Sequence, residues 1–292
     1  MKKGTISILI CMFIWGLSFI NIKVAIEFVG PMTLGFIRFA IASTLLFVIV
    51  KLGKYDYKIE RKDIKHMIST AIFGITLYFF FENNGIKYTN ASIASLIIAG
   101  IPIFTLIGDR LVYKTKMNTL SIIAVIINLL GVFLIVGRNI RNIFNASGSG
   151  YLYMLGAVLS WVAYSLLSKK LYTKYSSLII TLYQSIFGTI MFLPFIFFEE
   201  NHFDIITGEA IINILILAVF ASAIAMILYT KSMEQLGAFV SSLYLNLIPI
   251  VTIAFGFLLL GEKLSLMEFA GGGLILVSVI IPRVEFRQKA RD

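Results

Sequence analysis

The hydrophobic positions of this chain fall into ten long runs that are almost free of Asp, Glu, Lys and Arg, and short polar segments separate them. A bilayer core about 30 Å thick is crossed by an α-helix of roughly 20 consecutive apolar residues. The runs therefore predict ten transmembrane helices, which we expect at residues 4–26, 30–51, 64–84, 88–109, 117–137, 150–170, 176–198, 210–230, 236–260 and 265–282. Together they leave no stretch long enough for a separate soluble domain.

Composition supports an all-α integral membrane protein. The 292 residues are 59% hydrophobic and 14% charged, and the mean hydropathy is +0.94. Soluble domains carry about 25% charged residues, so these values exclude a water-soluble globular protein, and they also exclude a disordered chain. The single cysteine, Cys11, excludes an internal disulfide and a cysteine-based metal site. We expect neither a metal nor another cofactor.

Lys and Arg are distributed unevenly over the predicted loops. When the N-terminus is placed in the cytoplasm, 19 of the 25 basic residues lie on the cytoplasmic side and four lie outside. Cytoplasmic loops of membrane proteins are enriched in Lys and Arg, so this distribution predicts that both termini are cytoplasmic, in the cell membrane. The net charge of +10 then reflects topology, and the lipid bilayer rather than a nucleic acid is the expected partner.

The two halves of the chain match each other at a nearly constant offset of 146 or 147 residues. The matched pairs include Trp15 and Trp161, Lys23 and Lys169, Arg38 and Gln184, Ser95 and Ser242, and Pro102 and Pro249. They indicate a duplicated five-helix unit, and because five is odd, the second copy crosses the membrane in the opposite direction. Such inverted repeats build transporters in which the halves exchange conformations and thereby exchange the open side. The alternative is that duplication only builds a stable bundle.

Several segments in this order resemble a known family. They are Phe13–Phe19, Tyr88–Pro102 with its counterpart Gly237–Pro249, and Gly261–Ser265 leading into Gly271–Gly273. The chain resembles the drug/metabolite transporter superfamily, in particular its EamA-type ten-helix members. The resemblance implies two EamA-like repeats at residues 1–141 and 150–284, followed by a cytoplasmic tail at 285–292.

The resemblance also implies a function, namely a secondary carrier or exporter of small metabolites such as amino acids. Its substrate would bind in a central cavity between the halves. One position departs from the family pattern, because Glu262 of the second half maps onto Thr115, where family members often keep a Glu. A symmetric role for this acid is therefore in doubt.

Two tryptophans are the first candidates for the walls of such a cavity. Trp usually lies at the membrane interface, but Trp15 and Trp161 fall near the middle of their predicted helices. At the midplane they are suited to stacking or cation–π contact with a substrate. The alternative is that they fill the core, with the indole N–H bonded to a neighbouring helix. Ser18 and Tyr164 lie three residues further on and share the same helix faces.

Ionisable residues inside the spans form a second group of candidates, because each is costly to insert. Glu82 follows the apolar run of the third helix, where it is suited to bind a substrate amine or a proton, and Tyr78 shares its face. The alternative is a Glu wetted at the outer surface. Arg38 interrupts the second helix, where it attracts an anionic group, extends its side chain to the interface or pairs structurally. Lys23, near the end of the first helix, is expected to reach the interface with its long side chain.

Helices four and nine carry further candidates. Small residues at helical spacing, including Ser95 and Ser242, allow backbones to approach closely. Asn246 is a polar amide in mid-membrane and needs a partner from the protein or from a substrate. Pro102 and Pro249 are expected to kink their helices at matched positions, where paired gates are one interpretation.

These features lead to one preferred function and several alternatives. We predict a secondary transporter of small organic metabolites that works by alternating access, driven by a proton or substrate gradient because no phosphate-binding P-loop motif occurs. An enzyme is not expected, because the in-span acids are isolated and no catalytic cluster is visible. A passive channel and a non-transporting accessory protein remain as alternatives, and the sequence sets no oligomeric state.

Overall fold

The computed structural model describes residues 3–114, 119–137 and 146–289, and every regular element in them is helical. The first half of the chain contains α1 (Lys3–Ala25), α2 (Pro31–Leu52), α3 (Arg61–Ala71), η1 (Ile72–Leu77), α4 (Tyr78–Tyr88), α5 (Ala91–Ile98), α6 (Ile101–Tyr113) and α7 (Thr119–Gly137). The second half contains α8 (Ala146–Ser168), α9 (Ser177–Phe192), η3 (Leu193–Phe198), α10 (Gly208–Ile216), η4 (Leu217–Ile224), α11 (Ala225–Leu236), α12 (Ala238–Leu243), η5 (Tyr244–Asn246), α13 (Leu247–Leu260) and α14 (Leu266–Lys289).

Eight helical stretches of the described residues are long and apolar enough to cross a membrane. They are Gly4–Ala25, Pro31–Leu52, Arg61–Tyr88, Ala91–Val112, Gly148–Ser168, Ser177–Phe198, Gly208–Leu236 and Val240–Leu260. The two remaining predicted spans correspond to shorter apolar helices, Ile122–Ile135 and Leu266–Ser278. The chain is therefore an all-helical membrane protein. The helix α14 continues to Lys289, so the tail expected from residue 285 begins as helix.

Two of the predicted helices are interrupted at related positions. The helix expected at 88–109 divides into α5 and α6, and the helix expected at 236–260 divides into α12, η5 and α13. Pro102 lies at the start of α6 and Pro249 lies in the first turn of α13. Proline lacks the N–H that would continue the preceding turn, so each break comes just before the residue expected to kink the helix.

Two other predicted helices contain a widened π-helical stretch. The stretch η1 connects α3 with α4, and η4 connects α10 with α11, so the two lie at corresponding places in the two halves. A π-helix leaves carbonyl groups without their usual partner four residues on, and such segments are frequent at functional sites. Periodicity alone did not predict them, because a π-turn changes the register by a single residue.

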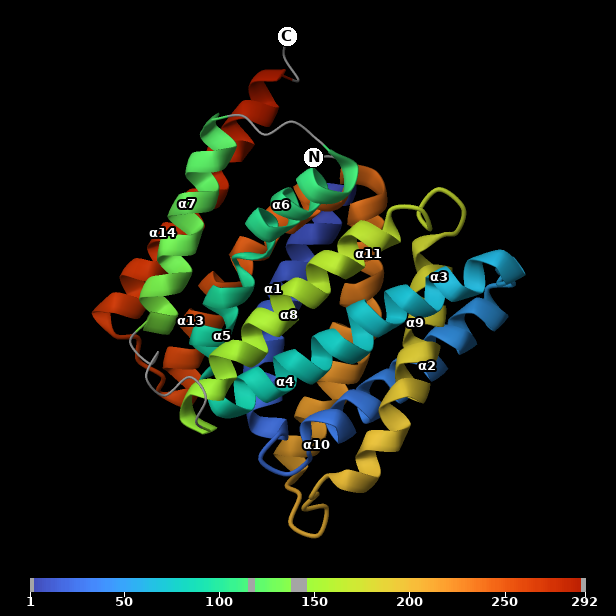
Figure 1. The fold of residues 1–292 in the computed structure, drawn as a ribbon. Helices are drawn as coiled ribbons and strands as arrows, with labels where there is room; N and C mark the ends of the chain where they lie inside the picture. The colour runs from blue at the N-terminus through green and yellow to red at the C-terminus, as the bar shows by residue number, and fades with distance from the viewer. Residues whose placement is uncertain (1–2, 115–118, 138–145, 290–292) are drawn as a thin grey trace.

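The two halves interlock around α1 and α8. The helix α1 packs against η4, α11 and α13 of the second half, and α8 packs against η1, α4 and α6 of the first half. Figure 1 shows α8 crossing the middle of the molecule in front of α1. Backbones approach closely at this interface, since a Cβ on Gly74 of η1 would collide with the ring of Tyr164. Substitution of this glycine would therefore push the halves apart.

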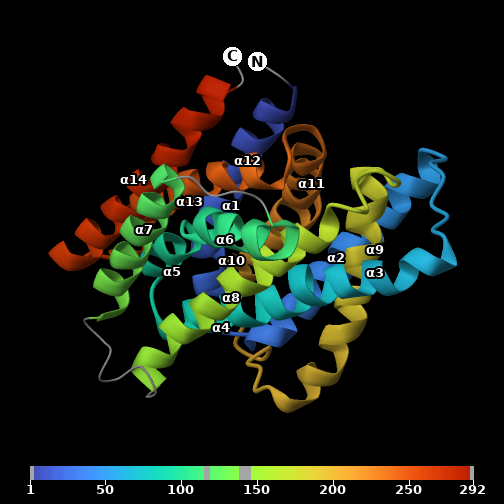
Figure 2. The ribbon, with the colours of Figure 1, turned by 45° about the horizontal axis from the view of Figure 1, so that its top comes forward.

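The helices α7 and α14 form a separate pair along one edge of the molecule, as both ribbon views show (Figures 1 and 2). Gly131 and Gly271 allow the two backbones to touch, and a Cβ on Gly271 would lie 2.7 Å from the Gly131 carbonyl oxygen. The amide of Asn128 donates to the Ser278 hydroxyl at 3.0 Å. The beginning of α1 and the end of α14 lie at the same end of the molecule (Figure 2).

Candidate functional site

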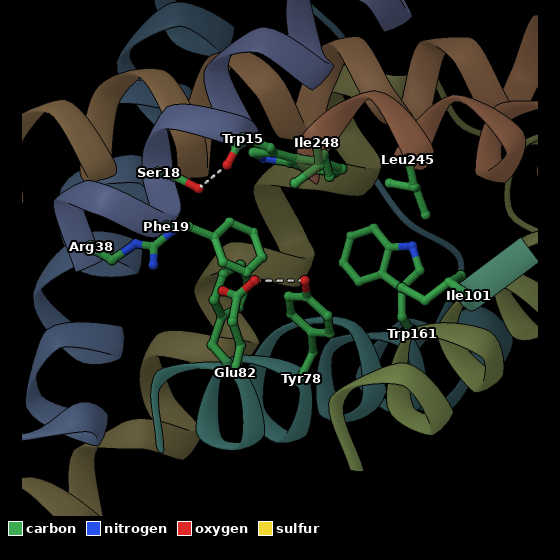
Figure 3. A pocket seen from close by; sticks show the side chains of 11 residues that line it. Trp15, Ser18, Phe19, Arg38, Tyr78, Glu82, Ile101, Trp161, Leu245 and Ile248 are labelled. Carbon is green, nitrogen blue, oxygen red and sulfur yellow. Dashed lines mark hydrogen bonds between the residues drawn. The ribbon is translucent and has the colours of Figure 1, made fainter. Parts of the chain in front are cut away.

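A central cavity lies where α1, α2, α4 and α8 meet the interrupted helices of both halves (Figure 3). Six of the residues expected to bind a substrate line it, namely Trp15, Ser18, Arg38, Tyr78, Glu82 and Trp161. They come from four helices and from both halves of the chain. The structure thus brings together the two tryptophans and the in-span charges that were singled out separately in the sequence.

Aromatic rings form one wall of the cavity. The rings of Trp15 and Trp161 meet edge to face with centroids 5.4 Å apart, and Tyr229 packs against both, with centroids 4.9 and 5.3 Å away. The Trp15 indole N–H donates to the Ala221 carbonyl in η4 at 3.1 Å, and the Trp161 N–H donates to the Tyr229 hydroxyl at 3.3 Å. Each indole therefore bonds to a neighbouring helix through its N–H group and also lines the cavity.

Glu82 stands on the opposite wall of the cavity. Its side chain is buried, with 3% of the residue surface exposed, which contradicts the alternative of a wetted acid at the surface. The Tyr78 hydroxyl donates to one carboxylate oxygen at 2.7 Å, and Figure 3 shows this bond directed into the cavity. The pair lies one helical turn apart at the start of α4, directly after the π-stretch η1. A buried acid with one hydroxyl donor is suited to bind a cation or a proton.

Arg38 faces the same cavity from α2 and is 1% exposed, so it does not extend to the membrane surface. Its Nε donates to the Ser222 hydroxyl at 3.1 Å, and its guanidinium lies 4.6 Å from the Phe79 ring centroid. Its Nη1 has no hydrogen-bond partner in the described part of the chain. The ion pairs of that part do not include one between Arg38 and Glu82. The cavity thus contains a basic and an acidic side chain that lie near each other without a direct ion pair.

The cavity is contracted in this structure. It leaves about 10 Å³ for the centres of water molecules, which is about the volume that one water needs. A metabolite therefore enters only if the surrounding helices move apart. In the described residues no three His, Cys, Asp or Glu side chains are grouped as metal ligands would be.

Five further lining residues were not expected from the sequence. They are Phe19, Phe79, Ile101, Leu245 and Ile248. Ile101 and Ile248 immediately precede the matched prolines and are themselves 147 residues apart. The repeat offset alone could therefore have identified them as a matched pair. Leu245 lies within the interruption η5, which the sequence pattern did not predict.

The other candidates lie elsewhere. Ser95 is buried but donates to the Ser92 carbonyl of its own helix, and Ser242 is buried outside the cavity lining. Asn246 faces a different hollow, between α1, α13 and α14. Tyr164 packs on Trp161 with ring centroids 4.9 Å apart without lining the cavity. The repeat counterpart of Asn246 is Ala99, at an offset of 147 residues, and it does not line the cavity either.

Partly buried polar bonds gather at one end of the molecule, the Lys23 end. The Lys23 amine donates to the carbonyls of Ile86 and Thr89, at 2.9 and 2.8 Å, where α4 meets α5. Beside it, the Glu262 carboxylate accepts the backbone N–H groups of Ala91 and Ser92 at 2.8 and 2.9 Å. Each charge complements a helix terminus of the opposite partial charge. Lys23 thus bonds to protein carbonyls at the end of α4.

Ion pairs hold the opposite end, the Lys169 end. Lys169, the repeat partner of Lys23, bonds to Asp109 at 2.6 Å. Lys174, in the loop after α8, bonds to Asp63 at 2.9 Å, and this hydrogen bond to the carboxylate raises the pKa of Lys174. The Tyr175 hydroxyl donates to the same carboxylate at 2.8 Å. Matched lysines therefore close opposite ends of one molecule.

Comparison with known proteins identifies the family. The model of the EamA-like transporter family matches residues 2–137 and matches again at residues 148–282. The chain belongs to this family. An uncharacterized transporter of Archaeoglobus fulgidus is 31% identical over 96% of this chain and 98% of its own length. The uncharacterized transporter YcxC of Bacillus subtilis is 26% identical over 96% of this chain and 92% of its own.

The remaining comparisons agree with this membership. The uncharacterized inner membrane transporter YicL of Salmonella typhimurium is 25% identical over 99% of this chain and 98% of its own length. A solved crystal structure of a protein with 16% identity covers 95% of this chain with a TM-score of 0.65, which shows a shared fold. With its apolar spans, the chain is a multi-pass transporter of the cell membrane, and its relatives are named as transporters rather than enzymes.

Proposed function

We propose that this EamA-family protein is a secondary transporter of small zwitterionic metabolites, such as amino acids and related compounds. The observation that supports the proposal is a buried basic and a buried acidic side chain in one cavity that form no direct ion pair. Arg38 and Glu82 line it from two helices without pairing, beside the aromatic wall of Trp15 and Trp161. A substrate with one carboxylate and one ammonium group complements both.

The energetics favour a ligand that carries both charges. A buried ion without a partner is strongly destabilising, whereas good geometry and further hydrogen bonds offset its desolvation. The free Nη1 of Arg38 is available to a carboxylate, and Glu82 has only the Tyr78 hydroxyl as its donor among the described residues. An indole face adds cation–π attraction for an ammonium group. A molecule with a single charge would contact only one of the two residues.

Alternating access is the mechanism we infer for the movement of this substrate. The contracted cavity requires the helices to separate before a metabolite enters. Two family matches along the chain support two five-helix repeats, at 1–141 and 150–284. An odd number of helices in each makes the repeats antiparallel, with both termini in the cytoplasm. The matched Lys23 and Lys169 bonds then act as gates on opposite sides.

Export coupled to a proton gradient is the direction and energy source we infer. Export follows from the family resemblance. Glu82 supports the coupling, because its carboxylate binds either a proton or the substrate ammonium group but not both. A proton that enters from outside and occupies Glu82 releases the substrate. In this scheme Pro102 and Pro249 mark the points at which the interrupted helices bend as the gates exchange.

Thermal unfolding of the purified protein with ligand panels tests the substrate class. Each panel contains a neutral amino acid, the amine left after removal of its carboxylate, and the acid left after removal of its amine. Ligand binding raises the unfolding temperature according to its affinity, so the zwitterion is expected to raise it most. An amine or an acid that stabilises as strongly as its zwitterion would contradict the proposed charge complementarity.

A further inference from the structure

A second group of polar side chains is buried beyond the aromatic wall. Tyr164, Ser165 and Ser168 of α8 and Gln184 of α9 are each 0% exposed. In the described part of the chain, the three hydroxyl oxygens and the Gln184 Oε1 have no hydrogen-bond partner. We refer to these four residues, together with Thr230 of α11, as the neutral polar cluster.

Four members of the neutral polar cluster face one another, whereas the fifth, Ser165, lies beside Tyr229. The Tyr164 hydroxyl lies within interaction range of Ser168, Gln184 and Thr230, and of Tyr172 in the loop after α8. On α8, residues 164 and 168 are one turn apart and therefore share a face. These groups converge on one place between three helices and a loop.

Two hydrogen bonds fix the edge of the cluster and leave polar atoms at its centre without a partner. The Gln184 Nε2 donates to the Thr70 hydroxyl at 3.0 Å, which leaves the Gln184 carbonyl oxygen free. The Thr181 hydroxyl lies 3.4 Å from that of Thr230 and donates to it. The Gln184 amide and the Thr230 hydroxyl are thus held in place. Hydrogen-bonding atoms without a partner remain at the centre of the cluster.

The cluster occupies the repeat-related position of the central cavity. Trp161 corresponds to Trp15, and at the same offset Tyr164 corresponds to Ser18 and Gln184 to Arg38. From Trp15, the helix α1 runs past Ser18 toward the Lys23 end, whereas from Trp161, α8 runs past Tyr164 toward Lys169. The cavity and the cluster therefore lie on opposite sides of the tryptophan pair.

The chemistry of the two places differs. The central cavity contains a cation and an anion, whereas the neutral polar cluster contains hydroxyl groups and one amide. Buried hydroxyl and amide groups are costly without hydrogen bonds, so four of them at one place require polar partners. A ligand with a net charge would find no countercharge among the cluster members. The partners that fit are neutral hydrogen-bonding groups.

We propose that the neutral polar cluster is a second binding subsite, which takes the uncharged hydrogen-bonding groups of a net-neutral substrate and its accompanying water. This proposal rests on the proposed function, because the subsite would be the next binding place for a substrate that moves from the central cavity to the Lys169 end. Tyr172 borders it on the loop side and donates to Met233 at 3.4 Å. A substrate that passes this subsite does so as an electrically neutral species, such as a zwitterion.

Cysteine modification tests whether the subsite is open to small polar molecules. In a Cys11→Ala background, Ser168→Cys is treated with methyl methanethiosulfonate, a small neutral reagent, and modification is followed by mass spectrometry. Ser95→Cys is the matched control, because Ser95 is equally buried but hydrogen-bonded and outside both sites. We expect Ser168→Cys to react about ten-fold faster, since reaction requires access. Equal slow rates in two folded variants would overturn the proposal.

A transport measurement separates this proposal from the proposed function. Gln184→Leu removes the amide, and Asn128→Leu is the control, because Asn128 is a buried amide between α7 and α14, away from the path. We expect Gln184→Leu to lower the flux of a neutral amino acid about ten-fold with substrate affinity within about two-fold of the wild type. Wild-type flux in Gln184→Leu overturns the subsite. If Ser168→Cys is labelled and the wild-type protein transports nothing, the subsite stands and the proposed function fails.

Discussion

Trp15 and Trp161, which are 146 residues apart in the chain, meet edge to face at the centre of the molecule with ring centroids 5.4 Å apart. Each indole N–H is bonded to the second half, one to the Ala221 carbonyl and one to the Tyr229 hydroxyl. The bonds fix both rings before a substrate arrives. In this account the pair separates the central cavity from the neutral polar cluster.

The first prediction concerns these rings. Trp15→Phe and Trp161→Phe keep an aromatic ring but remove the N–H bond, which contributes about 1 kcal/mol to stability. We expect both variants to fold and to lower transport about ten-fold, because the wall that contacts the substrate is smaller and freer to turn. Initial rates in proteoliposomes and unfolding temperatures measure the two effects. Phe13→Leu is the control, since Phe13 is 52% exposed to lipid. Normal transport by both tryptophan variants would remove them from the site.

The second prediction concerns the pH dependence of transport. In the wild type, a falling pH protonates Glu82 and weakens substrate binding, because the neutral acid no longer attracts an ammonium group. Glu82→Gln mimics the protonated acid at every pH, so we expect slow transport that no longer varies with pH. Glu209→Gln is the control, because Glu209 lies in the exposed first turn of α10. A Glu82→Gln profile that keeps the shape of the wild-type profile would exclude this residue from coupling.

The third prediction concerns the recognition of the substrate carboxylate. Arg38→Met removes a charged hydrogen-bonding group, worth about 1.5–3 kcal/mol, and is expected to weaken the affinity for a neutral amino acid about 10- to 100-fold. The corresponding amine lacks the carboxylate, so its affinity should stay unchanged or rise. Equilibrium binding to the purified variant measures both constants. Equal losses for the amino acid and for its amine would indicate a structural role for Arg38.

The fourth prediction concerns the matched lysines. Lys23→Met removes bonds at one end of the molecule and Lys169→Met removes the Asp109 bond at the other. We expect Lys23→Met to raise the labelling of Ser18→Cys by a membrane-impermeant maleimide from outside, and Lys169→Met to lower it. The Cys11→Ala background provides the baseline. A change in the same direction in both variants would contradict gates at opposite sides.

Much of this arrangement could be predicted from the sequence. Lipid demands long apolar runs, so the spans are visible directly, and the repeat offset pointed to Trp15 and Trp161 as partners. Glu82 and Arg38 can be recognised as candidates because a charged residue inside a span is costly to insert into the membrane. The two helix interruptions lie beside Pro102 and Pro249, whose missing N–H groups can be recognised in any sequence.

Other features depend on tertiary contacts that no local pattern carries. The mid-membrane position of Asn246 predicts a place in the cavity, whereas the residue lies in the 3-10 turn Tyr244–Asn246 and lines a different hollow. The π-stretch η4 supplies the Ala221 carbonyl to α1 and the Ser222 hydroxyl to α2, and these contacts exist only once the halves are packed. Lys23 likewise has its partners 63 and 66 residues away.

The central claim is that this protein carries a zwitterion by alternating access, and counterflow in proteoliposomes tests it most directly. Vesicles loaded with an unlabelled neutral amino acid that stabilises the protein are diluted into a trace of the labelled compound. The account predicts transient accumulation of label inside above its external concentration, saturable by substrate and absent from Arg38→Met vesicles. Label that only equilibrates, with a flux that grows linearly with the gradient, would contradict a carrier and indicate a passive channel.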